Sequence, residues 1–94
     1  MSGLVQAKNA LTALKQKFPD GAPDVSLLSE EQKAWLELKI QMLAEGVQSS
    51  QTIMELCKIR NQLVHATEDI PDKELQKMVS FVFNNINDIQ RIIS

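Results

Sequence analysis

The sequence has few of the residues that define several large classes of protein. Its 94 residues include one cysteine, one histidine, three glycines and no tyrosine. One cysteine and one histidine cannot form a zinc site within one chain, and three isolated glycines make no phosphate-binding loop. The single thiol, Cys57, lies on the apolar side of a helical pattern, so we expect a reduced side chain that packs as a small hydrophobe.

Long apolar runs and an excess of positive charge are also missing. No run approaches the roughly 18 residues of a membrane span, and no basic segment followed by an apolar one indicates a signal peptide. The formal net charge is −2, so the chain has no excess of basic residues, which many proteins that bind nucleic acids or anionic membranes have. We therefore expect a cytoplasmic protein with no membrane partner.

Helical periodicity is the strongest pattern that the sequence does contain. Apolar residues recur at spacings of three and four, which is typical of amphipathic helices, in residues 4–18, 29–47, about 50–65 and 72–93. No strand pattern and no internal repeat is found. The sequence predicts a single all-α domain over residues 1–94, a four-helix up-and-down bundle, or a three-helix version if the second and third helices fuse near Gly46.

The connection after the first helix has two specific signals. Two prolines and a glycine in residues 19–23 exclude continuation of the helix. Ser29, followed three residues later by Gln32, predicts a capping box at the start of the next helix. Between them, we expect the connection to pack through Val25, Leu27 and Leu28.

The end of the third predicted helix is marked by a proline. Pro71 pushes Ile70 out of the helical region, so the helix has to end before it. Asp72 and Glu74 then suit the positive N-terminus of a fourth helix. We expect these carboxylates, like the Glu30–Glu31 pair, to be solvated helix starts and not catalytic groups.

The aromatic residues suggest an exposed edge. Phe81 and Phe83 differ by two positions, so one face of a helix cannot bury both. We expect one of them to contact a partner chain or to cover the edge of the bundle. Trp35 is a second candidate for an interface.

One arginine interrupts the apolar face of the third predicted helix. At 100° per residue, Arg60 falls in the middle of four apolar residues, Leu56, Cys57, Leu63 and Val64. A guanidinium keeps its charge, so Arg60 needs a partner, a wet cleft or an interface. His65, the only histidine, follows five residues later and is the one side chain that normally titrates near neutral pH.

The run Arg60-Asn61-Gln62-Leu63-Val64-His65 resembles the signature of the HEPN superfamily, an arginine, often followed by a polar residue, with a histidine several residues later. The loop to Pro71 and the amphipathic helix after it fit the same pattern, so the resemblance covers about residues 50–93. It implies a helical bundle that works as a homodimer, with motifs from two subunits facing one cleft. It also implies a metal-independent endoribonuclease or RNA-binding protein of a toxin–antitoxin or defence system, without a cofactor.

The resemblance also implies a role for each motif residue. His65 would be the general acid or base near the 2′-hydroxyl or the leaving oxygen, Arg60 would hold the scissile phosphate, and Asn61 would orient the histidine or bind a phosphate oxygen. On a straight helix, side chains five positions apart point about 140° away from each other. Convergence therefore requires that the helix ends or distorts near Val64, or that two subunits pool their residues.

A structural interpretation of the same residues stays open. Arg60 could pair with Glu37, Glu45 or Glu55 inside the bundle, and His65 could stabilise the last carbonyls of its helix. The protein would then be a non-catalytic helical interaction, accessory or regulatory module with a cognate protein partner.

Overall fold

A computed structural model of the chain describes residues 2–46, 58 and 70–93. Within these ranges it contains four α-helices, one short 3₁₀ helix and no strand. The elements are α1 (Ser2–Lys17), η1 (Val25–Leu27), α2 (Glu30–Gly46), α4 (Asp72–Asn84) and α5 (Ile86–Ile93). The prediction of an all-α four-helix bundle is confirmed. Of the predicted helix at about 50–65 only Lys58 is described, and the question of a fusion with the second helix lies outside the described residues.

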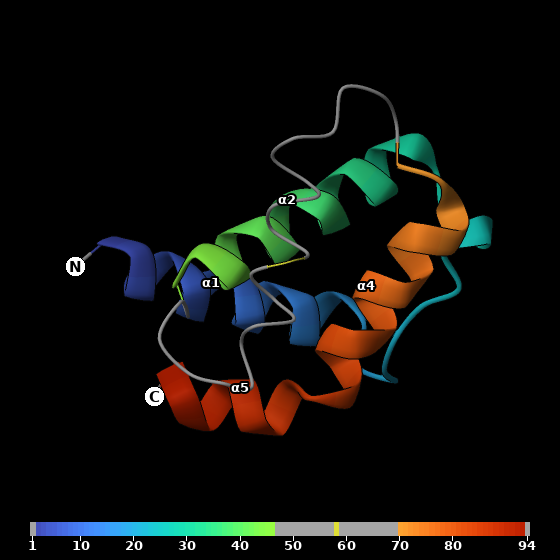
Figure 1. Cartoon of the computed structure of the whole chain (residues 1–94). Helices are drawn as coiled ribbons and strands as arrows, with labels where there is room; N and C mark the ends of the chain where they lie inside the picture. The colour runs from blue at the N-terminus through green and yellow to red at the C-terminus, as the bar shows by residue number, and fades with distance from the viewer. Residues whose placement is uncertain (1, 47–57, 59–69, 94) are drawn as a thin grey trace.

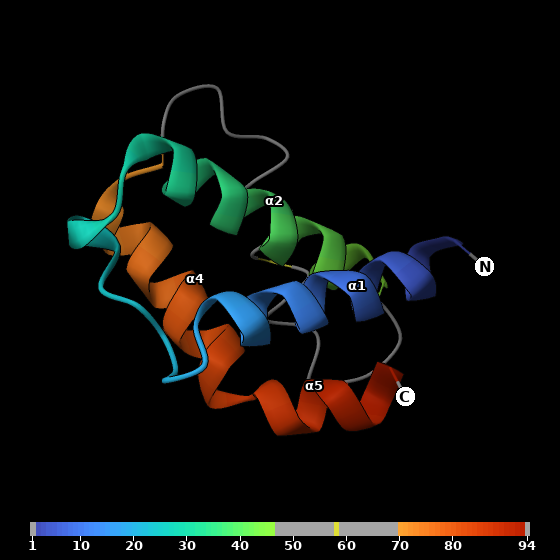
Figure 2. The same cartoon turned by 180° about the vertical axis from the view of Figure 1, so that it is seen from behind.

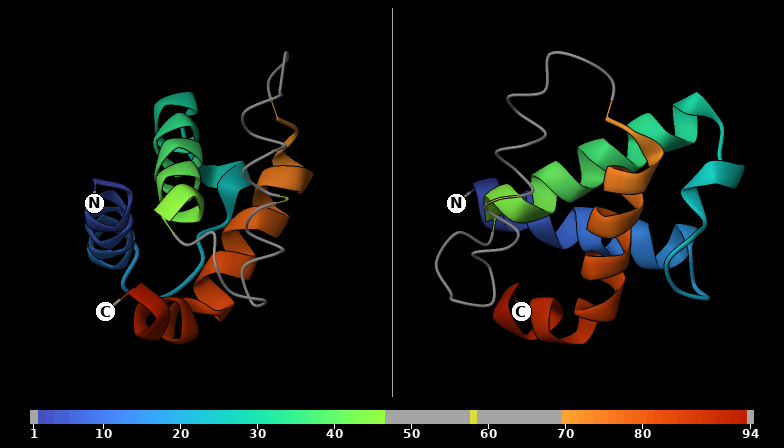
Figure 3. Two further views of the ribbon diagram at one scale, coloured as in Figure 1. Left: turned by 60° about the vertical axis from the view of Figure 1, so that its left-hand side comes forward. Right: turned by 45° about the vertical axis from the view of Figure 1, so that its right-hand side comes forward.

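The helices surround one core. α1 and α2 form an antiparallel pair, and α5 runs antiparallel to α1 on another side of it (Figures 1 and 2). α4 crosses this group steeply, and the left view of Figure 3 shows it on the far side of α2 from α1. α1 contacts α2 and α5, whereas α4 contacts α2 and η1. The start of α1 and the end of α5 therefore lie at the same end of the molecule.

The predicted apolar stripes supply the core. α1 and α2 pack closely because the small side chains of Ala7, Ala10 and Ala44 are fully buried among larger ones. No polar or charged residue is buried within the described ranges. The larger core side chains are Leu11, Leu14, Val25, Leu36, Ile40, Leu43, Leu75, Met78, Val79, Val82, Ile89 and Ile93.

The single helix predicted over residues 72–93 is wrong in one respect, because Asn85 divides it into α4 and α5. The Asn85 N–H donates to the carbonyls of Phe81 (3.2 Å) and Val82 (3.3 Å), and its side-chain amide donates to the Phe81 carbonyl (2.9 Å). The Asn85 carbonyl accepts from the Ile89 N–H at 3.0 Å. Asn85 thus ends one helix and starts the next, and α5 turns back along α1.

The connection between α1 and α2 is held against α4 by one amide side chain. Gln76 accepts from the Val25 N–H (2.9 Å) and donates to the Pro23 carbonyl (3.0 Å) and the Ser80 hydroxyl (3.2 Å). The expected packing of Val25 is confirmed, since its side chain is 1% exposed. The expected packing of Leu27 is wrong: it is 81% exposed, because the turn of η1 directs it away from the core.

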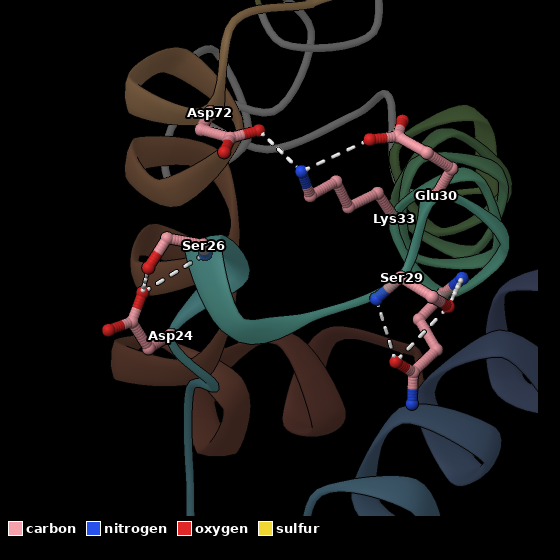
Figure 4. A network of polar contacts seen from close by, with 7 residues as sticks. Asp24, Ser26, Ser29, Glu30, Lys33 and Asp72 are labelled. Carbon is pink, nitrogen blue, oxygen red and sulfur yellow. Dashed lines mark hydrogen bonds and ion pairs between the residues drawn. The ribbon is translucent and has the colours of Figure 1, made fainter.

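The predicted capping box at the start of α2 is present. The Gln32 N–H donates to the Ser29 hydroxyl (3.2 Å), and the Ser29 N–H donates to Gln32 Oε1 (3.0 Å), as Figure 4 shows. Both bonds satisfy backbone donors that the first turn of a helix leaves without partners.

Candidate functional site

The residues that the sequence predicts as a site, Arg60, Asn61 and His65, lie outside the described residues. The structure therefore does not test their roles or their alternative ion pairs. Lys58, the one described residue near them, is exposed and helical. The described parts of the chain that flank this segment are the end of α2 at Gly46 and the start of α4.

The start of α4 agrees with its prediction. Pro71 has extended backbone angles (φ −58°, ψ 146°), and its carbonyl accepts from the N–H groups of Glu74 and Leu75 at 3.0 Å. Asp72 and Glu74 occupy the first turn, where carboxylates stabilise the positive end of a helix. The helix that follows the predicted motif therefore begins seven residues after His65.

A lysine of α2 joins the starts of two helices. The Lys33 ammonium lies 2.9 Å from a carboxylate oxygen of Asp72 in α4 and 3.5 Å from one of Glu30 (Figure 4). Its side chain is only 16% exposed. The hydrogen bond to Asp72, more than the neighbouring charge of Glu30, raises the pKa of Lys33 above 10.5. Lys33 is thus a protonated strut and cannot act as a base at neutral pH.

A hollow of about 400 Å³ surrounds this strut. Its described lining contains three carboxylates and one ammonium. The expectation of solvated carboxylates at the helix starts is confirmed, with side chains 87% exposed for Glu30 and 49% for Asp72. The sequence did not predict the link to Lys33. The lining residues are Glu30, Lys33, Ala34, Glu37, Ile70 and Asp72.

An aromatic cluster lies at the C-terminal end of α1. The ring of Phe18 lies edge-on to those of Trp35 and Phe83, with centroids 6.3 Å apart in each pair. Lys39 lies over the Trp35 ring, 5.7 Å from its centroid. All three rings are half-buried, and Phe81 also packs on the core. Phe18 thus covers Phe83 at the edge of the bundle, within this chain.

Two hollows flank the Phe18 ring, and each has a lysine at its margin. One, of about 340 Å³, is lined by Lys15, Phe18, Pro19, Gly21, Phe83 and Ile86. The other, of about 190 Å³, is lined by Lys17, Phe18, Glu31, Gln32 and Trp35. Sequence analysis singled out Trp35 but missed this site, because its rings come from three separate segments. The lysines at the end of α1 are the one local signal that could have indicated it.

Two kinds of feature are missing from the part of the chain that the structure describes. No helix there is long and apolar enough to cross a membrane. No group of acidic, histidine or cysteine side chains there could hold a metal ion.

A comparison of this chain with protein families, curated proteins and solved structures finds no match.

Proposed function

We propose that this chain is a small HEPN-like domain that cleaves RNA without a metal ion. The observation that carries the proposal is the run from Arg60 to His65, which combines a permanent cation, a polar residue and the only histidine. The amphipathic helices α4 and α5 follow it, which supports the proposal because HEPN domains have a helix at this point of the chain.

The reaction uses the 2′-hydroxyl of the RNA as its nucleophile. His65 moves the proton of this hydroxyl or of the leaving oxygen, while the 2′-oxygen forms a bond to phosphorus and the bond to the 5′-oxygen breaks. Arg60 stabilises the negative charge that develops on the phosphoryl oxygens, and Asn61 orients His65 or binds one of these oxygens. The products are a 2′,3′-cyclic phosphate and a 5′-hydroxyl.

The proposed enzyme is a cytoplasmic homodimer of a toxin–antitoxin or defence system, controlled by a cognate protein. Two subunits would bring together Arg60 and His65, which point about 140° apart on a straight helix. Sedimentation equilibrium tests this part of the proposal: it predicts twice the monomer mass of 10.6 kDa. A monomer that cleaves RNA would contradict it.

The test of activity is incubation of the purified protein with total RNA in EDTA. Cleavage is expected for the parent and for Lys77→Ala, in which an exposed cation of α4 is lost, and is expected to disappear in His65→Ala and Arg60→Lys. DNA of the same sequence should stay intact because it lacks the 2′-hydroxyl. Circular dichroism shows whether each variant is folded.

A non-catalytic interaction module is the second candidate. One observation favours it: the net charge of −2, which opposes binding of an anionic substrate. This function predicts that neither the parent nor any variant cleaves RNA. Arg60→Ala would then reduce thermal stability, because Arg60 would be an internal strut.

A further inference from the structure

One described helix, α1, carries basic side chains and no acidic one. α1 contains Lys8, Lys15 and Lys17 and no acidic residue, in a chain whose net charge is −2. Lys15 and Lys17 lie in its last turn and are exposed. Lys39 of α2 adds a further ammonium beside Trp35. The end of α1 thus carries positive charge that suits an anionic ligand.

The same region has aromatic rings that are not fully covered. Phe18 and Trp35 are half-buried, and the hollow between them has Lys17 at its margin, with Glu31 as its one acidic residue. The hollow on the other side of Phe18 has Lys15 at its margin and no acidic residue. Aromatic rings beside cations are the combination that binds single-stranded nucleic acid, because bases stack on the rings and phosphates pair with the cations.

We propose that the aromatic–lysine surface (Lys15, Lys17, Phe18, Trp35 and Lys39) binds single-stranded RNA, with a base against the Phe18 and Trp35 rings and phosphates on the lysines. The choice of RNA rests on the proposed function, whereas the anionic and aromatic character of the ligand comes from the surface itself. A duplex does not fit, because its bases are already stacked on each other.

The chain offers its own reporter for a test. Trp35 is the only tryptophan and there is no tyrosine, so the intrinsic fluorescence comes from this surface. The probe is a 2′-O-methyl oligouridylate of about 12 nucleotides, a length within the usual site sizes of single-strand-binding folds. It cannot be cleaved through a 2′-hydroxyl, so binding is measured apart from catalysis. We expect it to quench Trp35 at low salt, and we expect the duplex form to quench it far less.

Two double variants separate this surface from general electrostatics. Lys17→Ala with Lys39→Ala and Lys73→Ala with Lys77→Ala each make the net charge more negative by the same two units. The first pair should weaken binding about tenfold and reduce the steepness of the log–log salt dependence by about 1.4, which corresponds to two lost phosphate contacts. The second pair should leave the affinity and the slope of the salt dependence nearly unchanged. Equal effects of the two pairs would overturn the proposal.

Substitutions of Trp35 test whether its ring contributes to binding. With a fluorescein-labelled probe and anisotropy as the readout, Trp35→Leu should weaken binding about tenfold, the scale of one stacked base, while Trp35→Phe should restore most of it. A folded Trp35→Leu protein with unchanged affinity would contradict the proposal. Quenching without RNA cleavage by the parent would support this surface and refute the nuclease, whereas cleavage without quenching would support the nuclease and refute the surface.

Discussion

At the scale of single residues, several described polar side chains bond to groups near the ends of helices. Ser29 and Asn85 do so within their own segments, and Asp24 accepts from the N–H and the hydroxyl of Ser26. Gln76 differs, since its partners Val25 and Pro23 are 51 and 53 residues away. It is therefore a polar residue whose loss should disturb the tertiary structure.

We predict that Gln76→Ala lowers the free energy of unfolding by about 1–3 kcal/mol. The substitution leaves the Val25 N–H and the Pro23 carbonyl without the partners they now have, in a partly buried place. Urea denaturation measures the change. Gln16→Ala, at an exposed position of α1, is the matched control and should change stability by less than about 0.5 kcal/mol. Equal losses of stability in the two variants would show that Gln76 does not hold the connection between α1 and α2 against α4.

The carboxyl of Asp24 should titrate at unusually low pH. The hydrogen bonds from the Ser26 hydroxyl and from the Ser26 N–H lower the pKa of Asp24 below 3.8. The stabilisation that results is present above pH 3.8 and is lost as the pH falls through the lowered pKa. We predict that Ser26→Ala raises this pKa towards 3.8, as measured by NMR of the Asp24 carboxyl carbon. An unchanged pKa would show that the hydroxyl does not bind the carboxylate in solution.

Local signals explain which of these residues could be predicted. The capping box of Ser29 and Gln32 needs only a spacing of three residues, so the sequence predicts it correctly. The roles of Gln76 and Lys33 depend on partners from distant segments, which one sequence does not reveal. Leu27 was predicted wrongly because hydrophobicity alone does not give the direction of a side chain in a 3₁₀ turn.

At the scale of elements, the split between α4 and α5 shows where periodicity fails. The apolar spacing of three and four continues through Val82, Ile86, Ile89 and Ile93, so the sequence predicts one helix. The structure instead turns the chain at Asn85, and this turn lets α5 place Ile89 and Ile93 in the core beside α1. A spacing pattern states that a face is apolar but does not state which neighbour the face contacts.

The ion pair between Lys33 of α2 and Asp72 of α4 should make the free energy of unfolding depend on pH in the alkaline range. The pKa of Lys33 is raised above 10.5, so its contribution is fully present below pH 10.5 and is lost as the pH rises through the raised value. We predict that Lys33→Met is less stable than the parent at neutral pH and that the difference shrinks above pH 10.5. Urea midpoints at several pH values measure it. Lys77→Met, whose side chain is 66% exposed, should show little difference at either pH.

At the scale of the whole molecule, the core should dominate stability. We predict that Ile40→Ala, at a fully buried position, costs about 2–5 kcal/mol, a large part of the roughly 5–15 kcal/mol that folded domains have in total. Leu38→Ala, two residues away and 52% exposed, is the control and should cost less than about 0.5 kcal/mol. Urea denaturation of both variants checks the prediction. A similar loss for both would mean that the assignment of core and surface faces of α2 is wrong.

The candidate sites differ in how far the sequence could indicate them. The run from Arg60 to His65 is continuous, so sequence alone predicts it, and it lies outside the described residues. The rings of the aromatic–lysine surface, Phe18 and Trp35, and the neighbouring ring of Phe83 come from three separate segments of the chain. Only the fold brings these rings together, so the sequence could not predict the surface.

The bonds of Gln76 also have a consequence for the order in which the chain folds. α1 and α2 are neighbours in sequence and can form a helical hairpin early, whereas Gln76 can reach Val25 only after a loop of 51 residues has closed. Closing a loop of this length costs about 3.5 kcal/mol of chain entropy beyond the constant term. Docking of α4 should therefore follow the hairpin, so that loss of the Gln76 amide accelerates unfolding and leaves the refolding rate almost unchanged.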